Sequence, residues 1–148
     1  MAIKHVSVGE AHALQHQGWT YLDVRSTREF ENGHPAGAVH VPLLDEDEET
    51  GEMTPNPDFT RVIQANFAPD TQLLIGCQMG GRSLRAAQIL DASGFANVAN
   101  VRGGFGGGRD PMSGRPEPGW AQSDLPVESG SSPGAAYRDL AAKADAKE

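Results

Sequence analysis

The 148-residue sequence contains a single cysteine, Cys77. One thiol excludes a disulfide within the chain and any metal site built from several cysteines. The start, Met-Ala-Ile-Lys-His-Val-Ser, lacks the apolar stretch of a signal peptide, and no segment is long and apolar enough to span a bilayer. We therefore expect a cytoplasmic, reducing location and no membrane partner.

Basic residues are also scarce. The chain has 12 Lys and Arg against 20 Asp and Glu, a formal net charge of -8 and a pI near 5.0. A field of this sign repels nucleic acid and anionic membrane surfaces, so neither is an expected partner. An anionic substrate would have to be captured by a local pocket.

Signatures of cofactors and metals are missing as well. The five histidines show no metal-ligand spacing, and the glycine-rich residues 103–108 lack the Lys and Ser or Thr of a phosphate-binding loop. We predict neither a metal nor a cofactor.

Glycine and proline are plentiful, with 18 and 10 residues, and they are concentrated late in the chain. The length fits one domain, which we place at residues 1–128, with a Gly/Pro-rich insertion at about 106–119. That insertion is interpreted as a floppy surface loop rather than a segment over the functional site. Residues 129–148 read as a linker followed by an Ala-rich helix, for which a frayed terminal helix is favoured over a docking element.

Local signals predict an alternation of strands and helices. Capping boxes at Ser7/Glu10 and Ser26/Glu29 each start a helix, the first over 8–17 and the second ending at Gly33. Strands are predicted over 19–24, 39–41, 72–76 and 98–101, and further helices over 56–67, with Asn56 as cap, and 82–93. The acidic residues 45–52 are expected to form a solvated loop. This order predicts an α/β fold with a mostly parallel sheet.

The informative stretch surrounds Cys77. An apolar strand ends at Gly76, Cys77 follows, and Gly80-Gly81 leads into a helix that begins around Arg82. Glycines let successive backbone N–H groups point at one centre, and the helix start adds its own unpaired N–H groups. Both favour the thiolate, which is a nucleophile without a neighbouring base. The plain alternative, a small buried cysteine at a strand end, does not explain the residues that follow.

Three further residues have both structural and functional interpretations. Asp23 and Arg25 end a strand at the same sheet edge, where they either orient the Cys77 loop or form a salt bridge that fixes the next turn. We favour the salt bridge. His34 follows Gly33 and is interpreted as a hydrogen-bonded turn residue rather than a group of the site.

The segment Cys77-Gln78-Met79-Gly80-Gly81-Arg82-Ser83 resembles the active-site loop of the rhodanese-like domain family. Three more motifs match the family in order: Tyr21-Leu22-Asp23-Val24-Arg25, the segment from Glu29 to Pro42, and the segment from Gly94 to Phe105. The resemblance extends from about Ser7 to Val127. The resemblance implies that Trp120, which lies beyond the insertion, is the counterpart of a family tryptophan.

The resemblance implies a three-layer fold with a central, mostly parallel five-stranded sheet flanked by helices. It also implies that Cys77 takes a sulfane sulfur from thiosulfate or a persulfide and passes it to cyanide, a thiol or a sulfur-accepting protein. In this interpretation the remaining loop residues bind substrate, with Arg82 offering planar donors to an oxyanion, and Asp23 and Arg25 support them. The substrate-binding residues are Gln78, Met79, Gly80, Gly81, Arg82 and Ser83. Gln78 and Met79 are uncharged where some thiosulfate-preferring members of the family carry basic residues.

Two alternatives stay open. A cysteine phosphatase or arsenate reductase uses similar cradle chemistry, but its loop has one residue more between Cys and Arg than the four seen here. An arsenate reductase also needs a second thiol. A non-enzymatic sulfur carrier or interaction module would differ from an enzyme only in its acceptor, which the sequence does not name.

Overall fold

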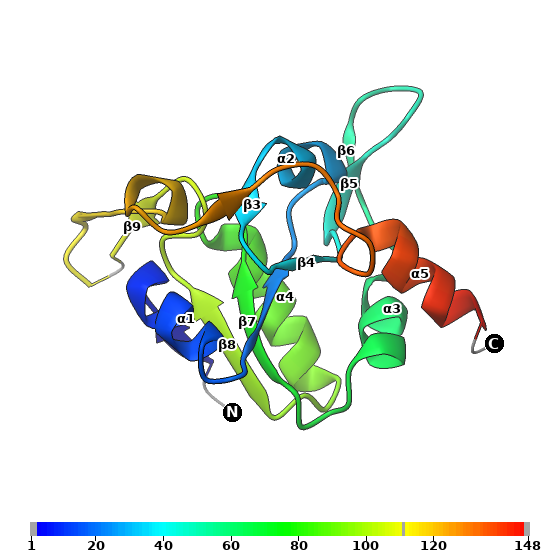
Figure 1. Ribbon diagram of the computed structural model, residues 1–148, viewed down its shortest axis with the longest axis horizontal. Coiled ribbons are helices and arrows are strands. Elements are labelled where there is room, and N and C mark those ends of the chain that lie inside the picture. Colours follow the sequence, from blue (N-terminus) through cyan, green and yellow to red (C-terminus); the bar gives the residue numbers. More distant parts are fainter. Residues whose placement is uncertain (1–2, 111, 147–148) are drawn as a thin grey trace.

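The computed structural model describes residues 3–110 and 112–146. Its centre is a sheet of five strands in the order β1–β8–β7–β2–β4, and every neighbouring pair is parallel (Figure 1). The strands are β1 (Lys4–Val6), β2 (Thr20–Asp23), β4 (Val39–His40), β7 (Gln72–Gly76) and β8 (Asn97–Val101). The prediction of an α/β fold around a five-stranded, mostly parallel sheet is confirmed.

Helices cover both faces of this sheet, which gives three layers. Because side chains alternate along a strand, Leu73 and Ile75 of β7 pack on one face and Leu74 on the other. The first face carries α3 (Phe59–Asn66), α4 (Gly81–Ala92) and α5 (Tyr137–Ala146). The second carries α1 (Val8–Gln15), α2 (Thr27–Asn32) and the 3₁₀ turn η1 (Trp120–Gln122).

Both predicted capping boxes are present. The Ser7 and Ser26 hydroxyls accept from the backbone N–H groups of Glu10 and Glu29, and each Glu carboxylate accepts from the cap's own N–H. These contacts join residues three apart, so the local sequence suffices to specify them.

Two local predictions are wrong in detail. The edge strand β1 was not expected, because three residues with one buried side chain carry too little pattern. Helix α3 begins at Phe59 with Asp58 at its N-cap, later than Asn56 and Pro57 suggested. The Asn56 carboxamide instead accepts from the Asp58 N–H and so forms the turn that precedes the helix.

The acidic residues 45–52 are not simply a solvated loop. They belong to an antiparallel hairpin of β5 (Leu44–Glu46) and β6 (Met53–Pro55) that projects from the body (Figure 1). The Asp45 carboxylate ties this hairpin to α2, because it accepts from both the backbone N–H and the hydroxyl of Thr27.

The expectation of a frayed terminal helix is also wrong. Helix α5 packs beside α3 (Figure 1), and its Leu140 and Ala144 are buried in the core. The Asn66 side chain donates to the Leu140 carbonyl, and Arg61 pairs with Asp145. The Ala-rich pattern of residues 135–147 gave no information about α3. In the structure α3 presents an apolar surface, which α5 covers.

The Gly/Pro-rich insertion is ordered at its base. Within its described residues, β9 (Gly108–Arg109) pairs with β10 (Pro116–Glu117), so the floppy-loop interpretation is wrong there. Beyond the insertion, the buried Trp120 donates its indole N–H to the Pro126 carbonyl.

Two further short strands, β3 (His34–Pro35) and β11 (Val127–Glu128), form an antiparallel pair. Among helices of the described chain, none has the length and apolar character needed to cross a bilayer.

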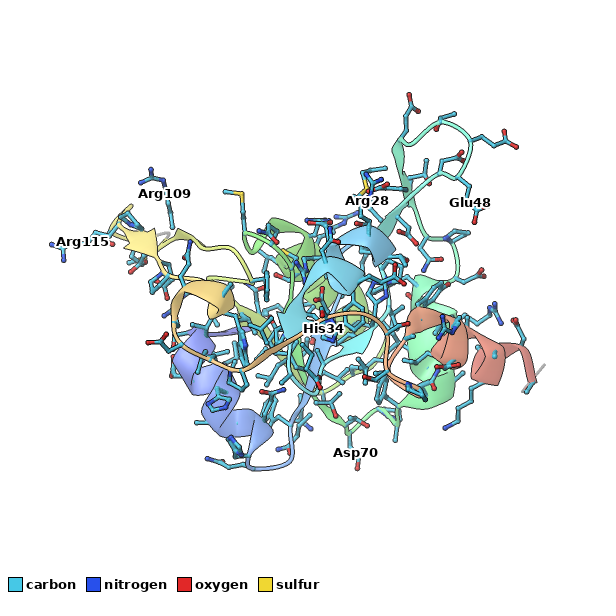
Figure 2. All side chains as sticks on the ribbon, turned by 45° about the horizontal axis from the view of Figure 1, so that its top comes forward. Arg28, His34, Glu48, Asp70, Arg109 and Arg115 are labelled. Carbon is cyan, nitrogen blue, oxygen red and sulfur yellow. The ribbon has the colours of Figure 1, made fainter. Side chains whose placement is uncertain are left out.

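The β9–β10 and β5–β6 hairpins both project from the body of the molecule. Figure 2 shows Arg109 and Arg115 on the β9–β10 projection and Glu48 on the β5–β6 hairpin, at opposite ends of the molecule.

His34 lies between these two projections in Figure 2. Its ring is buried and stacked on the Phe30 ring with 3.7 Å between the ring centres, and its Nδ1 is 2.7 Å from the Phe30 carbonyl. The expected hydrogen bond is confirmed, but the expected turn is wrong, because His34 is the first residue of strand β3.

Candidate active site

The Cys77 loop (residues 77–83) lies at the carboxyl edge of the parallel sheet, between the end of β7 and the start of α4. Cys77 is 2% exposed, and its Sγ accepts from the backbone N–H groups of Gly80 at 3.1 Å and Ser83 at 3.3 Å. Gly80 has a φ of +100°, and a Cβ there would meet the Arg102 carbonyl at 2.7 Å. The loop thus turns N–H groups toward the sulfur, as the sequence predicted.

Ser83 connects the sulfur to a second set of polar groups. Its buried Oγ lies 3.4 Å from Sγ of Cys77 and donates to the Asn100 carboxamide oxygen at 2.5 Å. The Asn100 amide nitrogen in turn lies 3.2 Å from Nδ1 of His5, which is on the surface. Asn100 and His5 were not predicted as site residues, because only the neighbouring positions of β1, β8 and β7 bring them here.

The segment after β8 forms the back wall of the loop. The Phe105 N–H donates to the Cys77 carbonyl at 2.7 Å, and the Gly106 N–H donates to the Gln78 carbonyl at 2.9 Å. Gly104 has a φ of +57°, and a Cβ there would come within 2.4 Å of the Cys77 carbonyl oxygen. Because Phe105 and Gly106 bind the loop carbonyl groups on the outer side of the loop, the loop N–H groups can face the sulfur. The glycine pair after a predicted strand was the available signal for this close approach.

Arg25 holds one end of the loop. Its guanidinium pairs with Asp23 at 2.8 Å, with both side chains nearly buried, and donates to the Gly33 carbonyl and, at 3.0 Å, to the Gln78 side chain. It also lies over the Phe105 ring, 4.5 Å from its centre. The predicted salt bridge is therefore present, and the same arginine contacts the Cys77 loop.

Arg82 holds the other end. It makes a two-fold ion pair with Glu29 of α2, at 2.7 and 3.0 Å, and does not hydrogen-bond to Cys77. Burial raises the pKa of Glu29, but the hydrogen bond and charge of Arg82 outweigh it and lower this pKa to about 2. The same bond raises the pKa of Arg82. The sequence predicted that Arg82 offers planar donors to a bound oxyanion, and it gave no sign that Glu29 is its partner.

The remaining predicted residues differ in exposure. Met79 is 69% exposed at the tip of the loop, and Gly81 is exposed at the first position of α4.

No group of three or more His, Cys, Asp or Glu within residues 3–110 and 112–146 is arranged to hold a metal ion.

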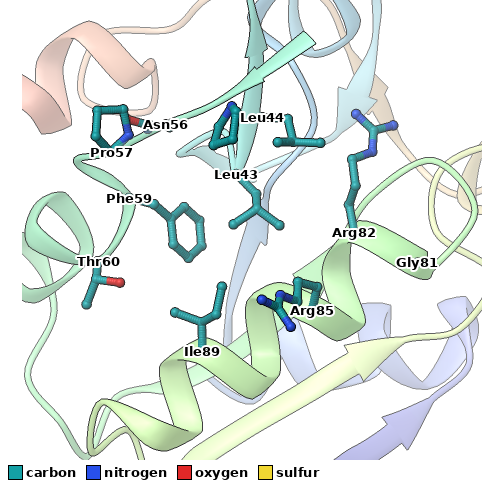
Figure 3. Close-up of a pocket in the computed structure, with 11 residues that line it drawn as sticks. Leu43, Leu44, Asn56, Pro57, Phe59, Thr60, Gly81, Arg82, Arg85 and Ile89 are labelled. Atoms are coloured by element: carbon teal, nitrogen blue, oxygen red, sulfur yellow. The ribbon is translucent and has the colours of Figure 1, made fainter.

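Two hollows flank the loop. The Gln78 pocket, about 490 Å³, is lined by residues that include Arg25, Glu29, Gln78 and Phe105. The Arg85 pocket, about 510 Å³, lies between α4, α3 and the base of the β5–β6 hairpin (Figure 3). Glu29 lines the first and Arg82 the second, so their ion pair lies at the boundary between the two.

Comparison with known proteins identifies relatives of this arrangement. The family model described as "Rhodanese-like domain" matches residues 7–109. Thiosulfate sulfurtransferase 16, chloroplastic, of Arabidopsis thaliana is 36% identical over 123 residues, which cover 83% of this chain and 91% of that protein. Thiosulfate sulfurtransferase GlpE of Haemophilus influenzae (strain PittEE) is 26% identical over 129 residues, covering 86% and 97%.

Solved structures show the same fold. The crystal structure of Rv0390 from M. tuberculosis superposes with a TM-score of 0.69 at 22% identity, covering 88% of this chain and all of that one. A rhodanese-related protein from Thermoplasma volcanium gives a TM-score of 0.57 at 20% identity, covering 84% and 97%. At these identities the structures establish the fold alone.

Proposed function

We propose that this chain, which belongs to the rhodanese-like domain family, is a thiosulfate sulfurtransferase that carries sulfane sulfur as a persulfide on Cys77. The observation that supports this most is the pair of N–H donors from Gly80 and Ser83 on Sγ. Donors at these positions stabilise negative charge on sulfur, both on the thiolate before transfer and on the persulfide after it.

The reaction has two displacements at sulfur. The Cys77 thiolate attacks the outer sulfur of thiosulfate, a new S–S bond forms, and sulfite leaves with the electron pair of the broken S–S bond. A thiophile, either cyanide or a thiolate, then attacks the outer sulfur of the persulfide and releases the Cys77 thiolate. No external oxidant or reductant is needed, because sulfane sulfur is only handed on.

The loop residues have separate roles in this proposal. Gly80 and Ser83 supply N–H groups to the sulfur, and Gly81 begins α4 between them. Gln78 and Met79 form the rim, and Asp23 and Arg25 keep the loop in shape. Arg82 uses two of its five N–H donors on Glu29 and offers the others to the anionic donor. Its position at the C-terminal end of the Cys77 loop supports this role on a chain whose net charge of -8 repels anions.

The acceptor is a thiol, cyanide or a sulfur-accepting protein, and a pure carrier would use the same persulfide. A cytoplasmic location also stays a prediction, because a relative at 36% identity is chloroplastic by name.

The test is intact mass measurement after incubation with thiosulfate. We expect a gain of about 32 Da, one sulfur atom, which cyanide removes, with thiocyanate as the product. Cys77→Ser should neither gain this mass nor turn over. Sulfur loading that persists in the serine variant would exclude Cys77 as the carrier.

A further inference from the structure

The Arg85 pocket combines an apolar floor with two cationic groups. Figure 3 shows Leu43, Phe59 and Ile89 pointing toward one another, with Arg82 and Arg85 along the adjoining part of α4. Leu43 and Ile89 are only partly buried by the protein itself. Partly covered aliphatic groups beside guanidinium groups favour a ligand that is itself part apolar and part anionic.

Arg85 differs from the arginines of the Cys77 loop. Arg25 is paired with Asp23, and Arg82 with Glu29. Arg85 is exposed, and within the described chain no hydrogen bond or ion pair engages its guanidinium. On a chain with a net charge of -8, an unpaired arginine at the edge of an apolar hollow is a local anchor for a carboxylate.

The pocket also reaches the C-terminal part of the loop that holds the sulfur. Gly81 and Arg82 line it and belong to the Cys77 loop. Arg82 and Arg85 are three residues apart on α4, so they follow one another on the same helix face, about 4.5 Å apart along the axis. A ligand seated here has one end at the loop and the other at Arg85.

We propose that the Arg85 pocket binds the sulfur acceptor, and that this acceptor is a small aliphatic thiol bearing a carboxylate. Its carbon chain lies against Leu43, Phe59 and Ile89, its carboxylate pairs with Arg85, and its thiol reaches the loop at Gly81 and Arg82. This inference rests on the proposed function, since it names the acceptor class of the second displacement. Thiosulfate has no apolar part and does not use this floor.

The transfer balances without a further reactant. The acceptor thiol gives its proton to water, and its thiolate attacks the outer sulfur of the Cys77 persulfide. A new S–S bond forms on the acceptor as the S–S bond to Cys77 breaks, and Cys77 leaves as a thiolate. The product is an alkyl persulfide that still carries its carboxylate.

The experiment uses wild-type protein loaded with thiosulfate and freed of excess donor. The rate of sulfur loss is followed by intact mass with 6-mercaptohexanoate, 6-mercaptohexanol or 3-mercaptopropanoate as acceptor. Wild type should react about fivefold faster with the six-carbon acid than with the matched alcohol. It should also prefer the six-carbon over the three-carbon acid, because only the longer chain covers the apolar floor.

Two variants assign these preferences to the pocket. Arg85→Gln should bring the acid-to-alcohol ratio to about one, whereas Arg138→Gln, which removes an equal charge from α5 outside the pocket, should leave it at the wild-type value. Ile89→Ala should reduce the preference for the longer acid, and loading stoichiometry checks that each variant is folded.

The outcomes separate this inference from the function on which it rests. Equal wild-type rates with acid and alcohol would overturn the acceptor site, as would an acid preference that survives in Arg85→Gln. Failure of wild type to load sulfur, or to release it to cyanide, would instead overturn the proposed sulfurtransferase.

Discussion

The two ends of the Cys77 loop are both held by arginines, but in opposite settings. At the Gln78 end, Arg25 has a side chain only 3% exposed, its charge is matched by Asp23, and its remaining donors are used on the Gly33 carbonyl and Gln78. At the other end, Arg82 and Glu29 remain 23% and 29% exposed beside the Arg85 pocket. Arg25 therefore has a structural role at the Gln78 end, whereas Arg82 at the other end keeps N–H donors that solutes can reach.

The difference follows from what each arginine must satisfy. A buried guanidinium needs a partner for its charge and for most of its N–H groups, so its contacts are set by the fold. A partly exposed guanidinium leaves N–H donors to water, and a substrate can replace that water. Changes at the Gln78 end should therefore damage the structure, and changes at the Arg82 end should damage binding.

The largest effect is expected from Arg25→Met, which leaves the buried Asp23 carboxylate without its cationic partner and, within the described residues, with only the backbone N–H of residue 25 as a hydrogen-bond donor. Removing one member of a buried pair costs about 3–5 kcal/mol, which we expect as the loss of unfolding free energy in urea. Sulfur loading should fall in the same variant, because Gln78 loses its support. A loss below about 1 kcal/mol, the range of surface pairs, would show that this end of the loop is not a scaffold.

A smaller loss of stability is expected from Gly104→Ala, which acts on the back wall. The new Cβ would come within 2.4 Å of the Cys77 carbonyl, and alanine disfavours the observed φ of +57°. We expect about 1–3 kcal/mol of destabilisation, and a displaced thiol should slow thiosulfate loading by roughly 100-fold. The matched control is Gly114→Ala, where φ is +74° and nothing lies within 4 Å. Equal loading by both variants would contradict the role of the wall.

Arg82→Ala should affect binding more than stability. We expect thiosulfate loading to slow roughly tenfold through the lost charge-assisted bonds, with a smaller effect on sulfur removal by cyanide from preloaded protein. Neither wild type nor the variant should hydrolyse an aryl phosphate. Robust hydrolysis by wild type that disappears in Arg82→Ala would favour the phosphatase alternative, and equal loading rates would reduce Arg82 to a structural residue.

The smallest effect is a pH dependence from the Glu29–Arg82 pair. The pKa of Glu29 falls from an ordinary value of 4.5 to about 2 in the folded chain, so its stabilising contribution is complete above pH 4.5 and is lost as the pH falls toward 2. The difference in Tm between wild type and Glu29→Gln should therefore be largest above pH 5 and shrink between pH 4.5 and 2. A difference that stays constant over this window would show that the ion pair does not form.

Local sequence was enough to predict the sulfur-facing half of the site. An apolar strand, Cys77, two glycines and a helix start lie within about a dozen residues, and their hydrogen bonds join positions three to six apart. The same holds for the capping boxes at Ser7 and Ser26. Such contacts depend on the local backbone conformation, which nearby residues determine. The order of residue types along the chain is therefore sufficient to predict these contacts.

The residues that surround the sulfur-facing half of the site are determined by the tertiary structure alone. Glu29 meets Arg82 across 53 positions, Asn56 meets Tyr137 across 81, and Gly104 contacts Cys77 because β8 pairs with β7. No local rule selects among the acidic residues of the chain as the partner of Arg82, or shows that α5 will cover α3. Strand order and helix packing make these choices, because they determine which distant side chains share a buried surface and must satisfy one another there.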